Sequence, residues 1–440
     1  MTYRFRDINK LAIPAIISGI VEPLLSLTDT AIVGNVPVNA VEAPAAVGIA
    51  GSFLSAIVWI LAQTRSAISA LIASHLGANK LDEVASLPSQ ILLINVLLSV
   101  LLMGITSYFA YGIFEFYNAQ GLILDTAVSY YKIRAYGLPL ILIIFTLFGV
   151  FRGMQNTFWP MIIAVIGAVV NIGLDVVLVY GIENWIPPMG VEGAAWASII
   201  AQVVMALLSV YLVLKKTPFR WNLGRRANPS LKPLINLSLN LFVRSASLNV
   251  ALYFANAFAT AYGGASIAAQ TIAFQIWLFF SFFIDGYSSV ANIVSGKLKG
   301  ANDFISLKNL INSVMKIAVI IAVGLGALCF VLYKPIGLLF TKDSAVLLAF
   351  YQIFWMVLIM QPINAVAFVY DGVFKGMAEA VALRNTLLIA TFLGFVPTIY
   401  LTDYFGLKLY GIWIAFMVWM LLRAGILIRI FNQRILPKKA

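Results

Sequence analysis

A six-residue string occurs twice in this sequence and decides its fold: Gly149-Val150-Phe151-Arg152-Gly153-Met154 returns as Gly372-Val373-Phe374-Lys375-Gly376-Met377. The same offset of 223 residues aligns Ala45-Ala46 with Ala268-Ala269, Gly77-Ala78-Asn79 with Gly300-Ala301-Asn302, and Pro139 with Pro362. Because one constant offset joins four separate segments, we infer that the two halves of the chain are copies of one structural unit.

The composition of the whole chain is that of an integral membrane protein. Of its 440 residues, 62% are hydrophobic and 10% are charged, whereas soluble proteins are about half apolar and about a quarter charged. The single cysteine, Cys329, and the single histidine, His75, exclude disulfides and cysteine- or histidine-rich metal centres within this chain. The net charge of +12 is concentrated in particular loops, where basic residues indicate membrane topology and not nucleic-acid binding.

Twelve apolar segments follow one another, each long enough to cross a bilayer, which takes about 20 residues. They cover residues 11–34, 44–74, 89–112, 127–150, 160–181, 193–214, 235–260, 266–294, 310–333, 347–373, 383–401 and 410–430. We therefore expect an all-α membrane protein with 12 transmembrane helices in two pseudo-symmetric six-helix lobes, an N-lobe (1–214) and a C-lobe (235–440). The linker between them, 215–234, contains six basic residues and no acid, so we place the linker and both termini in the cytoplasm.

Two duplicated lobes that rock about a midplane cavity are a common architecture of secondary transporters. A membrane-embedded transferase is the alternative from another class, but the chain has one histidine, no metal-ligand cluster and no sizeable soluble loop. We therefore expect a transporter, not an enzyme, with no cofactor.

Five acidic residues lie inside the predicted spans: Glu22, Asp29, Asp175, Asp285 and Asp371. A carboxylate in hydrocarbon costs at least ~3 kcal/mol, so each should be paired, neutral or hydrated. Judged by depth, Glu22 could pair with Arg65, and Asp285 with Arg244. Asp371 could contact a cationic substrate or form a local ion pair with Lys375.

Asp29 and Asp175 lie in the outer third of their spans, where we expect no Lys or Arg of the first half. Asn171 precedes Asp175 by four residues, which places both on one helix face. Two carboxylates and an amide oxygen could ligate Na+, or two close carboxylates could share a proton, so both ions remain open. The simpler alternative is that Asp29 caps a kink and Asp175 hydrogen-bonds a serine.

The sequence resembles the MATE (multidrug and toxic compound extrusion) family over nearly its whole length. The resemblance is carried by Leu27-Thr28-Asp29-Thr30-Ala31-Ile32-Val33-Gly34, by Arg152-Gly153-Met154 before Pro160, and by Asn171 with Asp175. Within that family it is similar to the DinF-like branch, on Arg244-Ser245, Phe282-Phe283-Ile284-Asp285-Gly286, Gln361-Pro362 with Asn364, and Asp371-Gly372.

The resemblance implies an ion-coupling site formed by Asp29, Asn171, Asp175 and Ser198, where relatives often have threonine in place of the serine. It implies a helix bend at Pro14, and Pro23 in the same span also favours a kink. A candidate substrate or C-lobe polar site comprises Asp285, Asp371, Asn364, Arg244 and Gln361. Two departures weaken a coupling role for the C-lobe: Arg244 lies in the span where some relatives have a glutamate, and Asn292 stands where DinF-like relatives tend to have an acid.

The implied function is a multidrug or organic-cation efflux antiporter, driven by an inward proton or sodium gradient through alternating access. The expected partners are a small amphipathic or cationic compound and the lipid bilayer of a bacterial inner membrane, with no nucleic acid and a functional monomer. The alternative within the same superfamily is a lipid-linked-oligosaccharide flippase.

Overall fold

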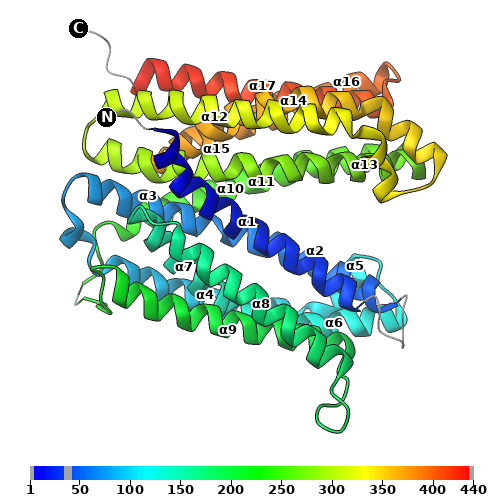
Figure 1. Cartoon of the computed structure of the whole chain (residues 1–440), viewed down its shortest axis with the longest axis horizontal. Coiled ribbons are helices and arrows are strands. Elements are labelled where there is room, and N and C mark those ends of the chain that lie inside the picture. Colours follow the sequence, from blue (N-terminus) through cyan, green and yellow to red (C-terminus); the bar gives the residue numbers. More distant parts are fainter. Residues whose placement is uncertain (1–3, 34–41, 225, 436–440) are drawn as a thin grey trace. The chain divides into compact units, whose positions relative to one another are not determined.

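The computed structural model describes residues 4–33, 42–224 and 226–435, and nearly all of these residues are helical (Figure 1). The side chains of Glu22, Ser26, Leu27, Thr30 and Glu42 lie outside the described set. The main helices are α1 (Phe5–Val33), α2 (Glu42–Leu61), α3 (Gln63–Gly77), α4 (Leu87–Tyr108), α5 (Ala110–Phe116), α6 (Gly121–Ala135), α7 (Gly137–Gly153), α8 (Phe158–Tyr180), α9 (Gly190–Lys216), α10 (Leu231–Ala261), α11 (Gly264–Gly300), α12 (Phe304–Val331), α13 (Tyr333–Phe340), α14 (Ser344–Gly376), α15 (Ala380–Ile389), α16 (Val396–Tyr404) and α17 (Lys408–Ile430).

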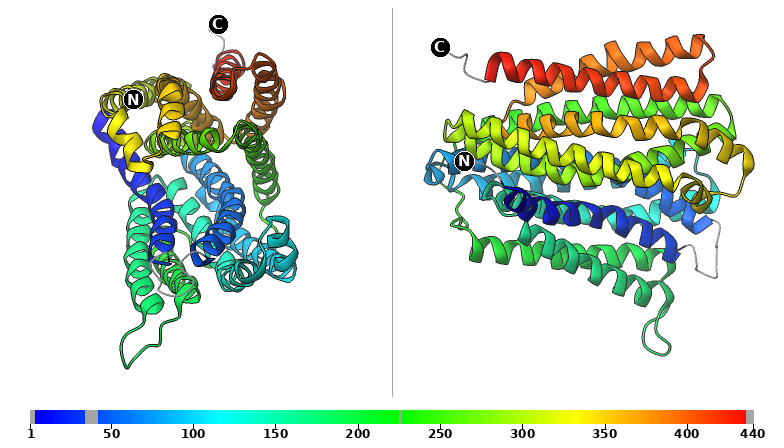
Figure 2. Two further views of the ribbon diagram at one scale, coloured as in Figure 1. Left: turned by 90° about the vertical axis from the view of Figure 1, so that its right-hand side faces the viewer. Right: turned by 45° about the horizontal axis from the view of Figure 1, so that its top comes forward.

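The chain divides into two compact units. The first unit contains residues 1–16, 76–79 and 235–440, and the second contains residues 17–75 and 80–234. Within the second unit, helices α8 and α9 pack against each other (Figure 2). The predicted limits of the lobes and linker stay a prediction.

The repeat found in the sequence is visible helix by helix. Helix α14, Ser344–Gly376, corresponds at the offset of 223 residues to the stretch from Gly121 to Gly153. That stretch is broken into α6 and α7, which meet at an angle of 43°. Helix α11 likewise matches α2 and α3 together. At these two places the first copy has a break where the second copy has a continuous helix.

The glycines of the duplicated string explain why that string is repeated. A Cβ atom on Gly153 would lie 2.6 Å from Cβ of Ile72 on α3, and one on Gly376 would lie 2.0 Å from the Asn292 carbonyl oxygen on α11. Side chains cannot be placed at such distances, so glycine lets the helix backbones approach closely, as small residues do in membrane helix pairs. Both copies use this contact at equivalent positions.

Ten described helical segments are long and apolar enough to span a membrane, and the bent pair α6–α7 makes up to eleven. Helix α10 has 31 residues but is not among them. It corresponds to the seventh predicted span, and it carries Lys232, Arg244 and four asparagines, which lower its hydropathy. The predicted total of twelve spans therefore stays a prediction.

Candidate functional site

A buried polar cluster in the second unit joins the C-terminal part of α1 to α8 and α9. The hydroxyl of Ser198 donates to Oδ2 of Asp29 at 3.2 Å, and Nδ2 of Asn171 donates to Oγ of Ser198 at 3.3 Å. Asp175, one turn beyond Asn171 on α8, is completely buried and lies within electrostatic reach of Asp29. The structure thus brings together all four residues that the resemblance implied.

Two glycines hold α8 and α9 close enough to form this cluster. A Cβ on Gly167 of α8 would lie 2.2 Å from the Met205 sulfur on α9, and one on Gly193 of α9 would lie 2.6 Å from the Leu178 carbonyl oxygen on α8. The close approach sets Ser198 opposite the Asn171 face of α8. In addition, the Tyr180 hydroxyl donates to the Ile32 carbonyl at 2.8 Å, which ties the C-terminal end of α8 to that of α1.

Four oxygen atoms of the cluster are buried and have no hydrogen-bond partner among the described residues. They are Oδ1 of Asp29, Oδ1 of Asn171, and both carboxylate oxygens of Asp175. A buried acceptor without a donor costs about 1–3 kcal/mol. A set of converging hard oxygen atoms favours a bound proton or a small hard cation, since such ions prefer oxygen ligands.

The expectation that no basic residue lies at the depth of Asp29 and Asp175 is wrong. Arg134 of α6 lies within electrostatic reach of Asp175, and also of Tyr130, which is four residues earlier on the same helix face. The Nε and Nη1 atoms of Arg134 are buried and have no hydrogen-bond partner in the part of the chain that the structure describes. The signal was present in the sequence, because Arg134 lies only seven residues inside the start of the fourth predicted span.

The predicted pair of Arg244 with Asp285 is also wrong. Arg244 of α10 instead forms an ion pair with Asp371 of α14, while Asp285 of α11 is exposed. Depth along the membrane normal could not say which helices are neighbours. The predicted pair of Glu22 with Arg65 falls on a side chain outside the described residues; the Arg65 guanidinium lies 5.4 Å from the Phe145 ring centroid.

Asp371 is shared by two arginines from different helices. Nη2 of Arg423 on α17 lies 2.5 Å from Oδ2 of Asp371, and Nη2 of Arg244 binds the same oxygen. All three side chains are buried, with Arg423 only 1% exposed. The guanidinium of Arg423 also stacks over the Trp419 ring at 4.8 Å. Lys375, one turn from Asp371, forms no ion pair with it in the described part of the chain.

For the remaining predicted positions, the contacts in the structure do not assign a role. Gln361 and Asn364 are fully buried, and Nδ2 of Asn364 donates to Oε1 of Gln361 at 3.1 Å. Helix α1 continues through both Pro14 and Pro23. A bend at either proline therefore stays a prediction.

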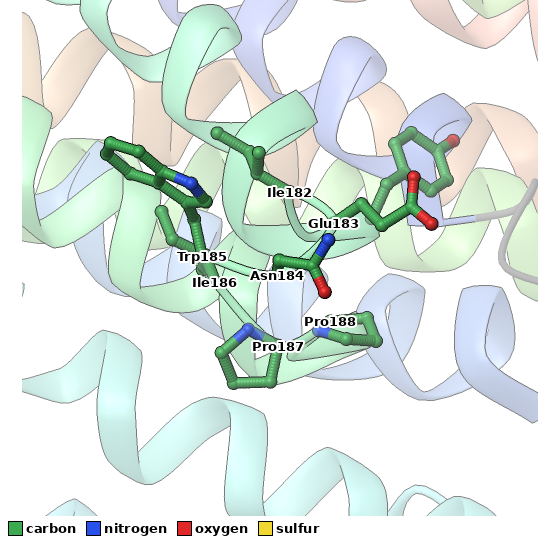
Figure 3. A pocket seen from close by; sticks show the side chains of 8 residues that line it. Ile182, Glu183, Asn184, Trp185, Ile186, Pro187 and Pro188 are labelled. Atoms are coloured by element: carbon green, nitrogen blue, oxygen red, sulfur yellow. The ribbon is translucent and has the colours of Figure 1, made fainter.

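A separate pocket of about 490 Å³ lies under the loop between α8 and α9 (Figure 3). Its lining consists of Tyr180 and residues 182–188. The Trp185 ring and the Glu183 carboxylate point to opposite sides of this loop, and Trp185 is 86% exposed. None of the lining residues belongs to the Asp29 cluster, so this pocket is not the ion site; an exposed tryptophan at a helix end is typical of the membrane interface.

Comparisons with known proteins agree along the whole chain. The family model described as MatE matches residues 14–177 and 241–400. DNA damage-inducible protein F of Escherichia coli is 26% identical over 429 residues, which are 96% of this chain and 91% of that protein. Protein DETOXIFICATION 44, chloroplastic, of Arabidopsis thaliana is 27% identical over 436 residues, 95% of this chain and 80% of that protein. A probable multidrug resistance protein NorM of Thermotoga maritima is 24% identical and covers 99% of this chain and 94% of its own length.

Solved structures show the same fold. A crystal structure of MATE in the bent conformation matches with a TM-score of 0.90 at 22% identity, covering 97% of this chain and 94% of that one. A MOP superfamily transporter from Pyrococcus furiosus matches with a TM-score of 0.88, also at 22% identity, covering 97% and 95%.

Proposed function

The chain belongs to the MatE family of membrane transporters, and from this premise we propose that it exports small amphipathic or cationic organic compounds in exchange for protons or sodium ions. The predicted all-α membrane fold of the MATE type is confirmed by its structural neighbours, and the chain is a transporter, not an enzyme. Its relatives include proteins named for multidrug resistance, which supports efflux of drug-like compounds.

The observation that carries the proposal is the buried cluster of Asp29, Asn171, Asp175 and Ser198, with its four unpaired oxygen atoms. A coupling ion that enters this cluster would satisfy those oxygens and remove the repulsion between the two carboxylates. Ion and substrate must then favour different conformational states or compete for the same carboxylates, because a ligand indifferent to the two states shifts no equilibrium.

The remaining parts of the proposal concern the setting of the protein. We place it in a bacterial inner membrane as a monomer with both termini in the cytoplasm, and we assign the first six spans to the N-lobe that holds the ion. The bacterial relatives support an inner-membrane location. None of the comparisons favours the flippase alternative.

The test is transport into everted membrane vesicles of a fluorescent organic cation under an imposed proton or sodium gradient. The variants are Asp29→Asn and Asp175→Asn, which remove a charge with little change in shape. The matched control is Glu115→Gln, because Glu115 is an exposed carboxylate at the end of α5. We expect one gradient to drive uptake in the wild type and the control, and neither to do so in the two aspartate variants.

Two results would count against the proposal. Uptake that persists in both aspartate variants would remove the cluster from ion coupling. No uptake by folded, inserted wild-type protein under either gradient would remove cation export altogether.

A further inference from the structure

The two copies of the repeat hold buried charges at different positions. At the offset of 223 residues, Asp175 corresponds to Thr398, and Asp371 corresponds to Phe148. Asp175 and Asp371 therefore have no charged equivalent in the other copy, whereas Lys375 corresponds to Arg152, so a basic residue occupies that position in both copies. An ionisable residue inside a membrane span is a functional-site hypothesis by default.

The cluster in the first unit is positive overall. Three cations, Arg244, Lys375 and Arg423, lie within electrostatic reach of two acids, Asp285 and Asp371. The formal charges sum to +1. In contrast, the cluster of the second unit, with Asp29, Asp175 and Arg134, sums to −1. An uncompensated positive charge in a low-dielectric interior is costly, so the first unit favours an added negative charge.

The two arginines retain donors that no described residue satisfies. Both bind the single oxygen Oδ2 of Asp371 through Nη2, and the Nε atoms of both are buried without a hydrogen-bond partner. Arg244 is 5% and Arg423 is 1% exposed. Guanidinium groups bind carboxylate and phosphate oxygens through pairs of parallel N–H donors, so the free Nε donors suit a second oxyanion.

Burial differs among the members of this cluster. Lys375 is half-buried and Asp285 is exposed, whereas Arg423 is almost fully buried. An anion entering from the Asp285 side would meet Lys375 before the arginines. Asp285 would oppose that entry by like-charge repulsion, and its negative charge therefore tunes how strongly an anion binds.

From these observations we propose that the C-terminal copy contains a binding site for an anionic group, a carboxylate or a phosphate, formed by Arg244, Lys375 and Arg423 and weakened by Asp285. The source of the group is either a soluble organic acid or the headgroup of an anionic lipid. This site is separate from the acidic cluster that couples to ions under the proposed function.

The test measures equilibrium binding to the full-length protein in neutral detergent, without any gradient, by isothermal titration calorimetry. The probes are 4-iodobenzoate, phenyl phosphate and the neutral isostere 4-iodobenzamide. The variants are Lys375→Gln and Asp285→Asn, since replacing Arg244 or Arg423 would remove one of the two partners of the buried Asp371 and endanger folding. Lys308→Gln removes an exposed positive charge of the same unit and is the control for net charge.

We expect both anions to bind about tenfold more weakly to Lys375→Gln and about tenfold more tightly to Asp285→Asn, as a unit charge nearby predicts at intermediate dielectric. Lys308→Gln should match the wild type, and the amide should not bind measurably. Equal binding of benzoate and benzamide, or affinities unchanged in both variants, would overturn the proposal. Unfolding temperatures of each variant identify loss of binding through misfolding, and Asp285→Asn remains informative because it predicts a gain.

A second arm identifies the source of the anion. Phosphatidylglycerol added in mixed micelles competes with 4-iodobenzoate if a lipid headgroup occupies the site, and phosphatidylcholine is the matched neutral-headgroup control. Competition that depends on Lys375 assigns the site to lipid, and absence of competition assigns it to a soluble acid; competition by both lipids alike would count against a charge-selective site. The binding experiment involves no ion gradient, so a negative result would not contradict the proposed ion coupling. Likewise, a negative result in vesicle transport would not contradict the proposed anion site.

Discussion

At the scale of single residues, buried charges are compensated by partners on other helices, and depth along the membrane does not identify those partners. Asp371 is compensated twice, by Arg244 and by Arg423. Among the described residues, the cation within electrostatic reach of Asp175 is Arg134. The second cluster is therefore the one left with acceptor oxygens unsatisfied. An internal arginine and an external cation would compete for the same two carboxylates.

Arg134→Gln tests that competition. Removing the guanidinium should raise the apparent affinity for the coupling ion by about tenfold, because a unit positive charge within electrostatic reach of Asp175 is lost. The measurement is the half-saturating ion concentration for cation uptake in everted vesicles.

Arg134→Lys is the matched control, since it keeps the charge and should stay near the wild-type value. An unchanged or lowered ion affinity in Arg134→Gln would show that the arginine does not oppose ion binding.

At the scale of elements, glycines decide which helices touch. The same positions of the repeated string approach α3 in one copy and α11 in the other. The turn positions are duplicated as well: Asn79 and Asn302 have φ of 56° and 55°, and Gln155 and Ala378 have φ of 61° and 60°. Left-handed backbone at both equivalent pairs means that the loops after these helices, and not only the helices, were copied.

Gly376→Ala should destabilise the protein by about 1–3 kcal/mol, as overpacking does. The added methyl group would lie 2.0 Å from a backbone oxygen of α11, which cannot rotate away as a side chain could. Thermal unfolding of purified protein in detergent measures the effect.

Gly104→Ala on α4 is the matched control, because its Cβ would meet nothing within 4 Å. Alanine is the better helix former, so this variant should be as stable as the wild type or slightly more stable. Equal unfolding temperatures for the two variants would contradict the packing argument.

At the scale of the whole molecule, one duplicated scaffold carries two unlike polar clusters. The acidic cluster belongs to the second unit and the arginine cluster to the first. Six spans per copy, an even number, would start both copies from the same side of the membrane. That arrangement sets the predicted orientation, with the loop holding Glu183 outside and the basic linker inside.

Cysteine labelling tests the orientation. In a Cys329→Ala background, Glu183→Cys should react with a membrane-impermeant maleimide in intact cells, and Ala227→Cys should react only in everted vesicles. Both positions are exposed, so lack of reaction reflects the side of the membrane and not burial. The reverse pattern would invert the topology, and labelling of both from one side would exclude six spans in the first copy.

The sequence alone determined the all-α membrane class and the duplication, and its resemblance to a known family implied the four residues of the acidic cluster. Hydropathy and helical spacing are read from one chain segment and a constant offset from two, so none of them needs coordinates. It did not determine which charges pair: Arg134 was missed, and Arg244 was assigned to Asp285 in place of Asp371.

Only the tertiary structure decided those partners, because residues on different helices meet according to which faces pack and which neighbours are adjacent. Glycine contacts on α8, α9 and α14 set that packing. Depth along the membrane normal gives one of the three spatial coordinates of a side chain. Whether two charged side chains form an ion pair depends on all three coordinates.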